Sequence, residues 1–372
     1  MKTIRALILY VKPYRWTVLL IMALIVAQVL TDLRIPQLIQ RIIDEGVATR
    51  DLETVLRLSA WMVGLTLLSA VLAIASSILS IRVGESTARD LRKAVFRKVQ
   101  AFSYGNLDHY STGQLMVRLT SDVQGLQRTV QMTLRMGSKG PLMMIGSVLL
   151  MVRTSPELAW SVLPLFVFAL GLIFFFSNRM EPSYRRVQEK LDTLNTVLQE
   201  NISGAELVKA FARADREIGR FDDANVSFAN SSIDVMQFLA VMTPTLTLIV
   251  NIGIVLIIWL GGGQVIAGGI SLGKLIAFVN YMLAIQVPLV MMINMANNLA
   301  NGLASGKRVF AMLDEQVEVM DPVEPLALPV GELGNVSFEE VDFQYELEDT
   351  LKILENLSLR SEKGQVVAIL GA

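Results

Sequence analysis

The stretch GSKGPLMMIGSVLLMVRTSPELAWSVLPLFVFALGLIFFF, Gly137–Phe176, decides the fold of this chain. It contains two apolar runs, Gly137–Val152 and Leu158–Phe176, separated by the short turn Arg153–Glu157, whose Ser-Pro pair favours chain reversal. A helix of about 20 apolar residues spans the roughly 30 Å hydrocarbon core of a bilayer. The stretch therefore predicts two membrane helices joined as a tight hairpin.

Further apolar runs of similar length lie on both sides of this hairpin. Together the candidate spans cover about residues 16–38, 56–81, 137–152, 158–176, 238–260 and 272–299. Hydrophobic residues make up 53% of the 372 positions and the mean hydropathy is +0.50, more apolar surface than a soluble domain hides. The first run is too long for a signal-peptide core. We therefore predict an all-α membrane protein with six transmembrane helices in a lipid bilayer.

Composition also excludes several classes of function. The net charge is −1, which argues against a partner nucleic acid. The sequence has no cysteine, so a disulfide framework, a thiolate nucleophile and a cysteine metal site are all excluded. The single histidine, His109, forms no metal site by itself.

The distribution of Lys and Arg predicts the orientation, because basic segments resist translocation. Residues 82–135 carry nine basic side chains and residues 179–220 carry eight, whereas the turn at 261–271 carries none. Basic residues also precede the first run. Both termini and both long connections, of about 55 and 60 residues, are therefore predicted to be cytoplasmic. These connections keep a helical spacing, so we expect the membrane helices to continue about 35 Å beyond the bilayer.

A change in composition after the sixth run marks a second domain. We predict a membrane domain over residues 1–313, an acidic, proline-rich linker over 314–334, and an incomplete, strand-forming domain over 335–372. Alternation in the strand segment breaks at Glu339 and Glu340, which predicts a β-bulge. The apolar run at 366–370 predicts a buried strand, and Gly371 follows it as the first glycine of a phosphate-binding loop would. Many buried strands end in glycine, so this signal is weak alone.

Taken in order, these segments resemble an ATP-binding cassette (ABC) exporter of the fused half-transporter kind, most similar to bacterial multidrug half-transporters. Three stretches carry the resemblance. They are SYGNLDHYSTGQLMVRLTSDV at Ser103–Val123, ENISGAELVKAFARADREIGRF at Glu200–Phe221, and VSFEEVDFQY followed by LKILENLSLRSEKGQVVAILGA at the C-terminal end. The resemblance covers essentially the whole chain and implies a six-helix membrane domain followed by an α/β nucleotide-binding domain, of which only the first β segment is present.

The resemblance implies that the full-length protein is an ATP-hydrolysing translocase with ATP and Mg²⁺ as cofactors. Tyr345 falls where the family has an aromatic residue that stacks on adenine; the alternative is an inward-facing strand residue. Gly371 corresponds to the first glycine of the phosphate loop. The catalytic ATPase residues of the family have no counterpart in this chain, so no residue here is predicted to be catalytic.

Two turns, at residues 106–111 and 202–206, correspond to the short coupling helices that dock on the nucleotide-binding domains of the family. The candidate contact residues are Leu107, Asp108 and Tyr110 in one turn and Ser203, Gly204 and Glu206 in the other. Glycines near both turns allow sharp reversal, and Tyr110 and Leu107 offer apolar anchors. The alternative is a plain reversal between two helices.

A polar stripe runs along the sixth run. It consists of Asn280, Asn294, Asn297, Asn298 and Asn301, which share one helical face. Amides are costly against lipid, so the stripe predicts either the wall of a substrate cavity or a seam between packed helices.

Charged side chains near the membrane have two further interpretations. Asp32 and Arg34, near the outer end of the first run, either pair as an external gate or extend separately to the interface. Arg118 and Asp122, four residues apart on a helix, are predicted to form a local ion pair.

The function implied by the resemblance is ATP-driven efflux of amphipathic or lipophilic small molecules across the cytoplasmic (inner) membrane. It would proceed by alternating access between two half-transporters, as a homodimer or a heterodimer. Two rival functions remain open at this point. One is a lipid or peptide exporter of the same fold, and the other is a membrane signalling receptor whose long helices relay a signal.

Overall fold

The computed structural model describes residues 2–317, 319, 324, 334–344 and 353–369. Inside the helices, the side chains at 170, 177, 289–290, 292–294 and 296–297 are outside this description. The chain divides into two compact units, Met1–Gln316 and Val317–Ala372.

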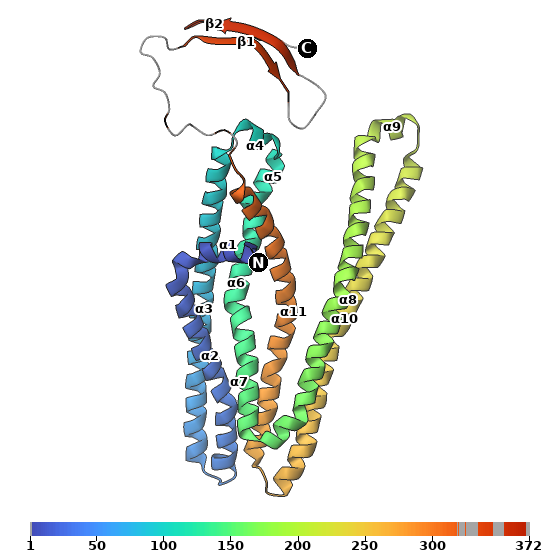
Figure 1. Ribbon diagram of the computed structural model, residues 1–372. Coiled ribbons are helices and arrows are strands. Elements are labelled where there is room, and N and C mark those ends of the chain that lie inside the picture. The colour runs from blue at the N-terminus through green and yellow to red at the C-terminus, as the bar shows by residue number, and fades with distance from the viewer. Residues whose placement is uncertain (1, 318, 320–323, 325–333, 345–352, 370–372) are drawn as a thin grey trace. The chain divides into compact units, whose positions relative to one another are not determined.

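The first unit is built from helices (Figure 1). In chain order they are α1 (Lys2–Val11), α2 (Arg15–Arg41), α3 (Leu52–Ala101), α4 (Tyr104–Asp108), α5 (Thr112–Val117), α6 (Val123–Met132), α7 (Ser138–Thr154), α8 (Pro156–Ser203), α9 (Ala205–Ala210), α10 (Ala214–Ile266) and α11 (Leu272–Asp314). Short 3₁₀ and π-helical segments continue some of these helices, at Lys12–Tyr14, Ile42–Val47, Arg118–Asp122 and Thr133–Gly137. The prediction of a mainly helical chain is confirmed.

Each apolar run found in the sequence lies inside a helix or begins one residue before it. Four helical stretches within the described residues are long and apolar enough to cross a membrane. They are Lys2–Val47, Leu52–Ala101, Pro156–Ser203 and Ala214–Ile266, and a shorter apolar helix covers Leu272–Pro288. α3 has 50 residues, which at about 1.5 Å per residue is about 75 Å long, far more than a bilayer needs. The long helices therefore extend well beyond a hydrocarbon core.

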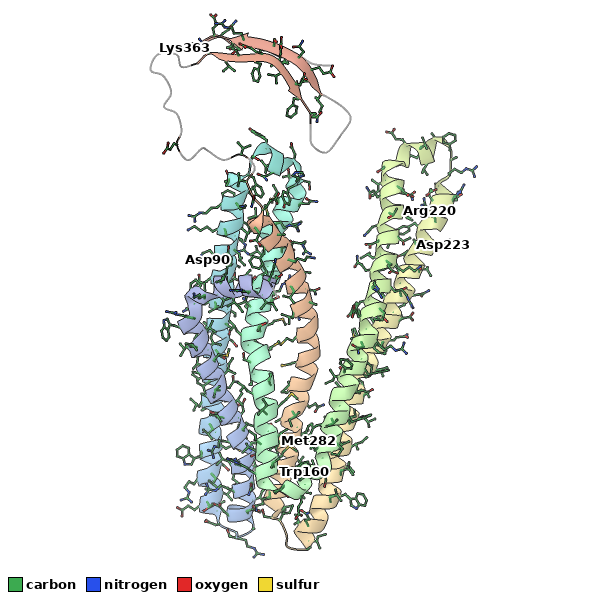
Figure 2. The ribbon with its side chains drawn as sticks, in the orientation of Figure 1. Asp90, Trp160, Arg220, Asp223, Met282 and Lys363 are labelled. Carbon is green, nitrogen blue, oxygen red and sulfur yellow. The ribbon has the colours of Figure 1, made fainter. Side chains whose placement is uncertain are left out.

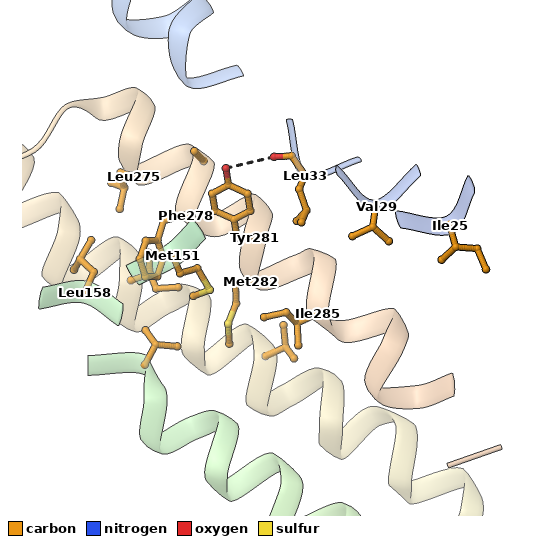
Figure 3. Close-up of a cluster of buried hydrophobic side chains, with 14 of the residues drawn as sticks. Ile25, Val29, Leu33, Met151, Leu158, Leu275, Phe278, Tyr281, Met282 and Ile285 are labelled. Carbon is orange, nitrogen blue, oxygen red and sulfur yellow. Dashed lines mark hydrogen bonds between the residues drawn. The ribbon is translucent and has the colours of Figure 1, made fainter. Parts of the chain in front are cut away.

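The buried core lies where α2, α7, α8, α10 and α11 meet. α11 contributes Phe278, Tyr281, Met282 and Ile285, which pack against Met151, Leu158 and a row on α2 formed by Ile25, Val29 and Leu33 (Figure 3). The hydroxyl of Tyr281 donates to the Leu33 carbonyl at 3.5 Å. By contrast, Trp61, Trp160 and Trp259 are mostly exposed. A helix bundle surrounded by lipid has a packed core in its interior and large apolar side chains on its outer surface, and both are found here.

The helices pack in pairs. α2 lies along α3, α7 along α11, and α8 along α10, which forms a long hairpin closed by α9 (Figure 1). Near the other end of that hairpin, α10 also contacts α11 and α8 contacts α7. The turn between α7 and α8 is short, as the Ser-Pro pair predicted: Ser155 precedes Pro156 at the first position of α8.

The second unit contains an antiparallel pair of strands, β1 (Val336–Phe343) and β2 (Leu354–Ser361). Val336 pairs with Ser361 and Phe338 with Leu359, and the register then shifts before Val341. Glu340 in the shifted segment has φ of 49°, so the predicted bulge is confirmed. The predicted buried strand at 366–370 is not found: residues 365–369 have no regular structure and Val366 is 94% exposed. A doubly buried strand needs covering layers, and the described part of this unit supplies none.

Candidate functional site

The first turn, defined here as residues 102–111, is fixed by its own side chains. Ser103 caps α4, its backbone N–H and hydroxyl donate to Asn106 Oδ1 at 3.2 and 2.9 Å, and its oxygen accepts from the Asn106 N–H. This reciprocal pairing satisfies donors that a helix start leaves open. Asn106 is buried, and its amide nitrogen donates to the Gln316 carbonyl at 2.9 Å. The turn is therefore attached to the end of α11.

Tyr110 makes a second attachment between the same two places. Its ring stacks on Phe102 with centroids 5.9 Å apart, and its hydroxyl donates to the Glu315 carboxylate. Burial, together with this hydrogen bond, raises the pKa of Tyr110 to about 12. Leu107 is half-buried and Asp108 is exposed. Three residues of this turn were predicted to contact a nucleotide-binding domain. One of them, Tyr110, thus also binds the residue that directly follows α11.

A buried carboxylate ties the segment after the first turn to α11 as well. Asp122 is 2% exposed and accepts from Arg118 Nη1 at 3.0 Å and from Arg308 Nε at 3.0 Å. The predicted ion pair with Arg118 is confirmed, and Arg308 completes it. Burial alone would raise the pKa of Asp122, but the hydrogen bonds from Arg308 and Arg118 outweigh it and hold the pKa below its usual range.

The second turn, defined here as residues 202–213, is closed by α8 and α10 alone among the described residues. The Gly204 N–H donates to the Glu200 carbonyl at 2.8 Å, and Asn201 Nδ2 donates to Glu217 at 3.1 Å. Arg220, labelled in Figure 2, pairs with Glu200 at 2.5 Å. Ser203 and Glu206, the other predicted contact residues, are exposed. The most exposed apolar side chains here are Ile202, Leu207 and Phe211, which the sequence reasoning did not select.

The asparagines of α11 differ in their surroundings. Asn280 is half-buried and donates to the Ile276 carbonyl of its own helix at 2.9 Å. The backbone carbonyl of Asn298 accepts from Thr129 of α6 at 3.4 Å, and Asn301 is exposed. The side chains of Asn294 and Asn297 lie outside the described residues. Within the described residues, α11 packs closely on α6 near the C-terminal end of the stripe, around Asn298.

For Asp32 and Arg34 the sequence left open either a mutual pair or separate positions at the interface, and the structure shows that they do not pair with each other. Asp32 pairs with Lys139 at 3.1 Å, and its other oxygen accepts from Ser69 of α3. Arg34 donates instead to Gln37 at 3.0 Å. Arg34 is two residues from Asp32, so on a helix the two side chains do not face each other. The signal for Lys139 was present, because it is a lysine inside a predicted span.

The residues predicted to contact nucleotide, Tyr345 and Gly371, lie outside the described residues. Within the described ranges, no group of three or more His, Cys, Asp or Glu side chains is arranged to hold a metal ion.

Comparisons with known proteins agree on one family. The profile described as ABC transporter transmembrane region matches residues 18–289. The chain is 30% identical over 363 residues to YfiB, an uncharacterized ABC transporter ATP-binding protein of Bacillus subtilis, which covers 98% of this chain and 63% of that protein. It is 30% identical over 363 residues to the uncharacterized ABC transporter ATP-binding protein Rv1273c of Mycobacterium tuberculosis, covering 98% and 62%.

A relative with a more specific name is an ATP-dependent lipid A-core flippase of Desulfotalea psychrophila, 28% identical over 364 residues, covering 96% of this chain and 62% of the flippase. The chain thus spans a little under two thirds of the length of these relatives. The family profile covers most of the chain, including α3 to α10 in full. The chain belongs to the family of ABC transporter transmembrane regions, and it is a multi-pass membrane protein.

Proposed function

We propose that this chain is the membrane part of an ATP-driven exporter that moves amphipathic or lipophilic small molecules across the cytoplasmic membrane. Family membership supports ATP as the energy source, since the relatives are ATP-binding proteins. ATP and Mg²⁺ would be held by a nucleotide-binding domain that begins near residue 335 and includes Tyr345 and Gly371. The membrane domain would extend over residues 1–313 and the linker over 314–334.

The proposal includes six membrane spans with both termini in the cytoplasm. α2, α3, α8 and α10 supply four long apolar helices. α7, with 17 residues continuing from α6, and the apolar first part of α11 would supply the other two. The basic residues in both long connections support their cytoplasmic location. Transport would require a second half-transporter, identical or different, because the family's exporters work as pairs.

The observation that carries the proposal is the double attachment of the first turn to Glu315 and Gln316, where the chain leaves α11. A force applied to that end of α11 would move the first turn, and the long helices would carry the motion toward the membrane. The second turn exposes Ile202, Leu207 and Phe211, an apolar surface suited to a second protein body. We assign coupling to both turns, including Leu107, Asp108, Ser203, Gly204 and Glu206.

Lipid export is a second candidate. Two relatives are named ATP-dependent lipid A-core flippases, and a lipid is itself an amphipathic substrate. The two candidates differ in whether the moved molecule is a bilayer component. A multidrug specificity is the finer hypothesis within the first candidate.

Reconstitution of the full-length protein in proteoliposomes tests the proposal. ATP should drive movement of a fluorescent amphiphile or of a labelled phospholipid, and the preferred probe separates the two candidates. Leu207→Ser should reduce transport about tenfold, the effect of losing about 1.4 kcal/mol at a docking anchor. Val226→Ser, at an exposed valine on the leg of α10, is the matched control and should leave transport unchanged. Absence of ATP-dependent movement for every probe would refute export.

A further inference from the structure

A cavity of about 400 Å³ lies among α2, α3, α7 and α11, within the described part of the first unit. Its size is in the range of cavities that hold small organic ligands, about 300–1,000 Å³. The apolar part of the wall includes Ile25, Met143, Val287 and Met291. Methionine side chains are flexible and polarisable, so such a wall adapts to apolar bodies of different shape. We call this space the α2–α7 cavity.

Three ionisable side chains also line the α2–α7 cavity: Asp32 on α2, Lys139 on α7, and Arg135 just before α7. Lys139 pairs with Asp32 at 3.1 Å. Arg135 is exposed to the cavity and has no carboxylate within ion-pair distance among the described residues. Two cations therefore face one carboxylate, and the cavity carries an excess positive charge.

Two of the three ionisable side chains lie at positions where a charge is costly without a partner. Asp32 and Lys139 both lie inside predicted membrane spans, at residues 16–38 and 137–152. Ionisable groups at membrane depth face the interior of a bundle or a water-filled path, and they mark sites for ligands or ions. Asp32 and Lys139 neutralise each other, so the positive charge of Arg135 is free to interact with an anionic ligand that enters the α2–α7 cavity.

We propose that the α2–α7 cavity binds the anionic head group of an amphipathic substrate. Lys139 and Arg135 are the cationic contacts, and the methionine-containing wall holds the apolar body. Asp32 keeps Lys139 in place when the cavity is empty and competes with the entering anion. The inference rests on the proposed export function, whose substrate it narrows from amphipathic molecules in general to anionic ones.

Ligands of other charge fit the cavity less well. A cation would need the Asp32 carboxylate, whose two oxygens already interact with Lys139 and Ser69. A neutral amphiphile would leave the excess positive charge of the cavity without a counter-charge. An anion such as a phosphate or sulfate meets both cations, and charge-assisted hydrogen bonds to such groups are the strong ones.

Equilibrium binding to the full-length protein in neutral detergent, without nucleotide, tests the proposal. The probes are three fluorescent amphiphiles with the same alkyl chain, ending in phosphate, maltose or trimethylammonium, and the readout is fluorescence anisotropy. The phosphate probe should bind at least about tenfold more tightly than the other two. Lys139→Gln and Arg135→Gln should each weaken phosphate binding about tenfold and leave maltoside binding unchanged.

The direction in which Asp32→Asn changes the affinity for the phosphate probe decides between a binding site and a purely structural ion pair. Removal of the competing carboxylate should tighten phosphate binding several-fold, whereas a purely structural ion pair would give weaker binding or none. If Lys139→Gln fails to fold, Arg135→Gln and Asp32→Asn still decide, because Arg135 has no ion pair to lose. The control is Arg153→Gln, on the same α7 helix but lining a different cavity of about 340 Å³ with Arg34. It should leave phosphate binding unchanged.

Any of three results would overturn the proposal. The three probes could bind equally well, the affinity for the phosphate probe could stay unchanged in Arg135→Gln and Asp32→Asn, or Arg153→Gln could lower that affinity as much as the cavity substitutions do. Competition by phosphatidylglycerol or by a soluble alkyl phosphate supports the site and identifies which source of anionic head group it takes. The outcome is separable from the export proposal. Transport of neutral or cationic probes alone leaves export standing and refutes this site, whereas selective phosphate binding without ATP-driven transport does the reverse.

Discussion

The two turns that close the long helix pairs are held in different ways. The first turn is bonded through Asn106 and Tyr110 to the end of α11, some 200 residues away in the chain. The second turn is bonded only to α8 and α10 within the described residues, and it exposes large apolar side chains such as Leu207. The first turn is part of a packed helix bundle. The second turn is the end of a helical hairpin, and its apolar side chains are exposed within the described residues.

The difference explains why similar interactions have unequal weight in the two regions. An arginine–carboxylate pair is present beside each turn, Arg308–Asp122 near the first and Arg220–Glu200 near the second. Asp122 is 2% exposed, whereas the Glu200 side chain is 51% exposed. Water compensates for a lost surface partner but not for a buried one. The stability of the first region therefore depends on single side chains, and that of the second on helix pairing.

The largest expected effect is that of Asp122→Ala. It leaves Arg118 and Arg308 without their shared carboxylate and should lower the free energy of unfolding by about 3 kcal/mol, the lower end for a broken buried pair because Arg308 is half exposed. Glu200→Ala, the matched change near the second turn, should cost about 0.5 kcal/mol. Thermal and denaturant unfolding of the purified protein in detergent measures both.

The pH dependence follows from the lowered pKa of Asp122. Its contribution is complete above the ordinary aspartate pKa of 3.8 and is lost as pH falls through the lower folded value. Asp122→Asn should remove that loss.

Equal destabilisation by Asp122→Ala and Glu200→Ala would show that the two regions are not held differently.

Two glycines test the same comparison through packing. A Cβ on Gly302 of α11 would collide with Thr129 Oγ1 of α6, whereas a Cβ on Gly219 of α10 meets nothing within 4 Å. Gly302→Ala should therefore destabilise by about 2 kcal/mol through overpacking. Gly219→Ala should stabilise by about 0.5 to 1 kcal/mol, since alanine is the better helix residue. Stabilisation by both substitutions would mean that α11 is not tightly packed on α6.

Much of the fold was predictable because it depends on local composition. An uncharged run such as residues 158–176 specifies a membrane helix without reference to the rest of the chain, and the Ser-Pro pair before Leu158 specifies the turn. The bulge at Glu340 was visible as a break in alternation. The buried strand at 366–370 was not found, because its burial depends on layers that a local pattern cannot show.

The sites were less predictable, since they depend on residues far apart in sequence. Asp122 was paired correctly with Arg118 four residues away but not with Arg308, 186 residues away. The only partner that the sequence suggested for Asp32 was its neighbour Arg34, as one of two alternatives, whereas its partner Lys139 comes from another helix. Nothing near Asn106 indicated Gln316. Amide and charge patterns identify which side chains need partners, but the packing of α11 against the earlier helices decides which partners they meet.

Among the substitutions in the region packed on α11, the smallest expected effect is that of removing the Tyr110 hydroxyl. Tyr110→Phe keeps the stacking on Phe102 and removes only the hydrogen bond to Glu315, so it should cost about 1 kcal/mol at neutral pH. Tyr184→Phe, at an exposed tyrosine on α8, should cost nothing measurable.

The raised pKa of Tyr110 adds a pH dependence that tests how its hydroxyl is held. Because its pKa is raised from 10.0 to about 12, the folded state holds the proton more tightly, and this stabilisation is complete below pH 10 and lost as pH rises toward 12. The difference in unfolding free energy between wild type and Tyr110→Phe should therefore shrink across that interval, while the difference for Tyr184→Phe stays flat. A difference that does not change with pH would mean that the Tyr110 hydroxyl is neither buried nor bonded to Glu315, and that Asn106 alone attaches the first turn to α11.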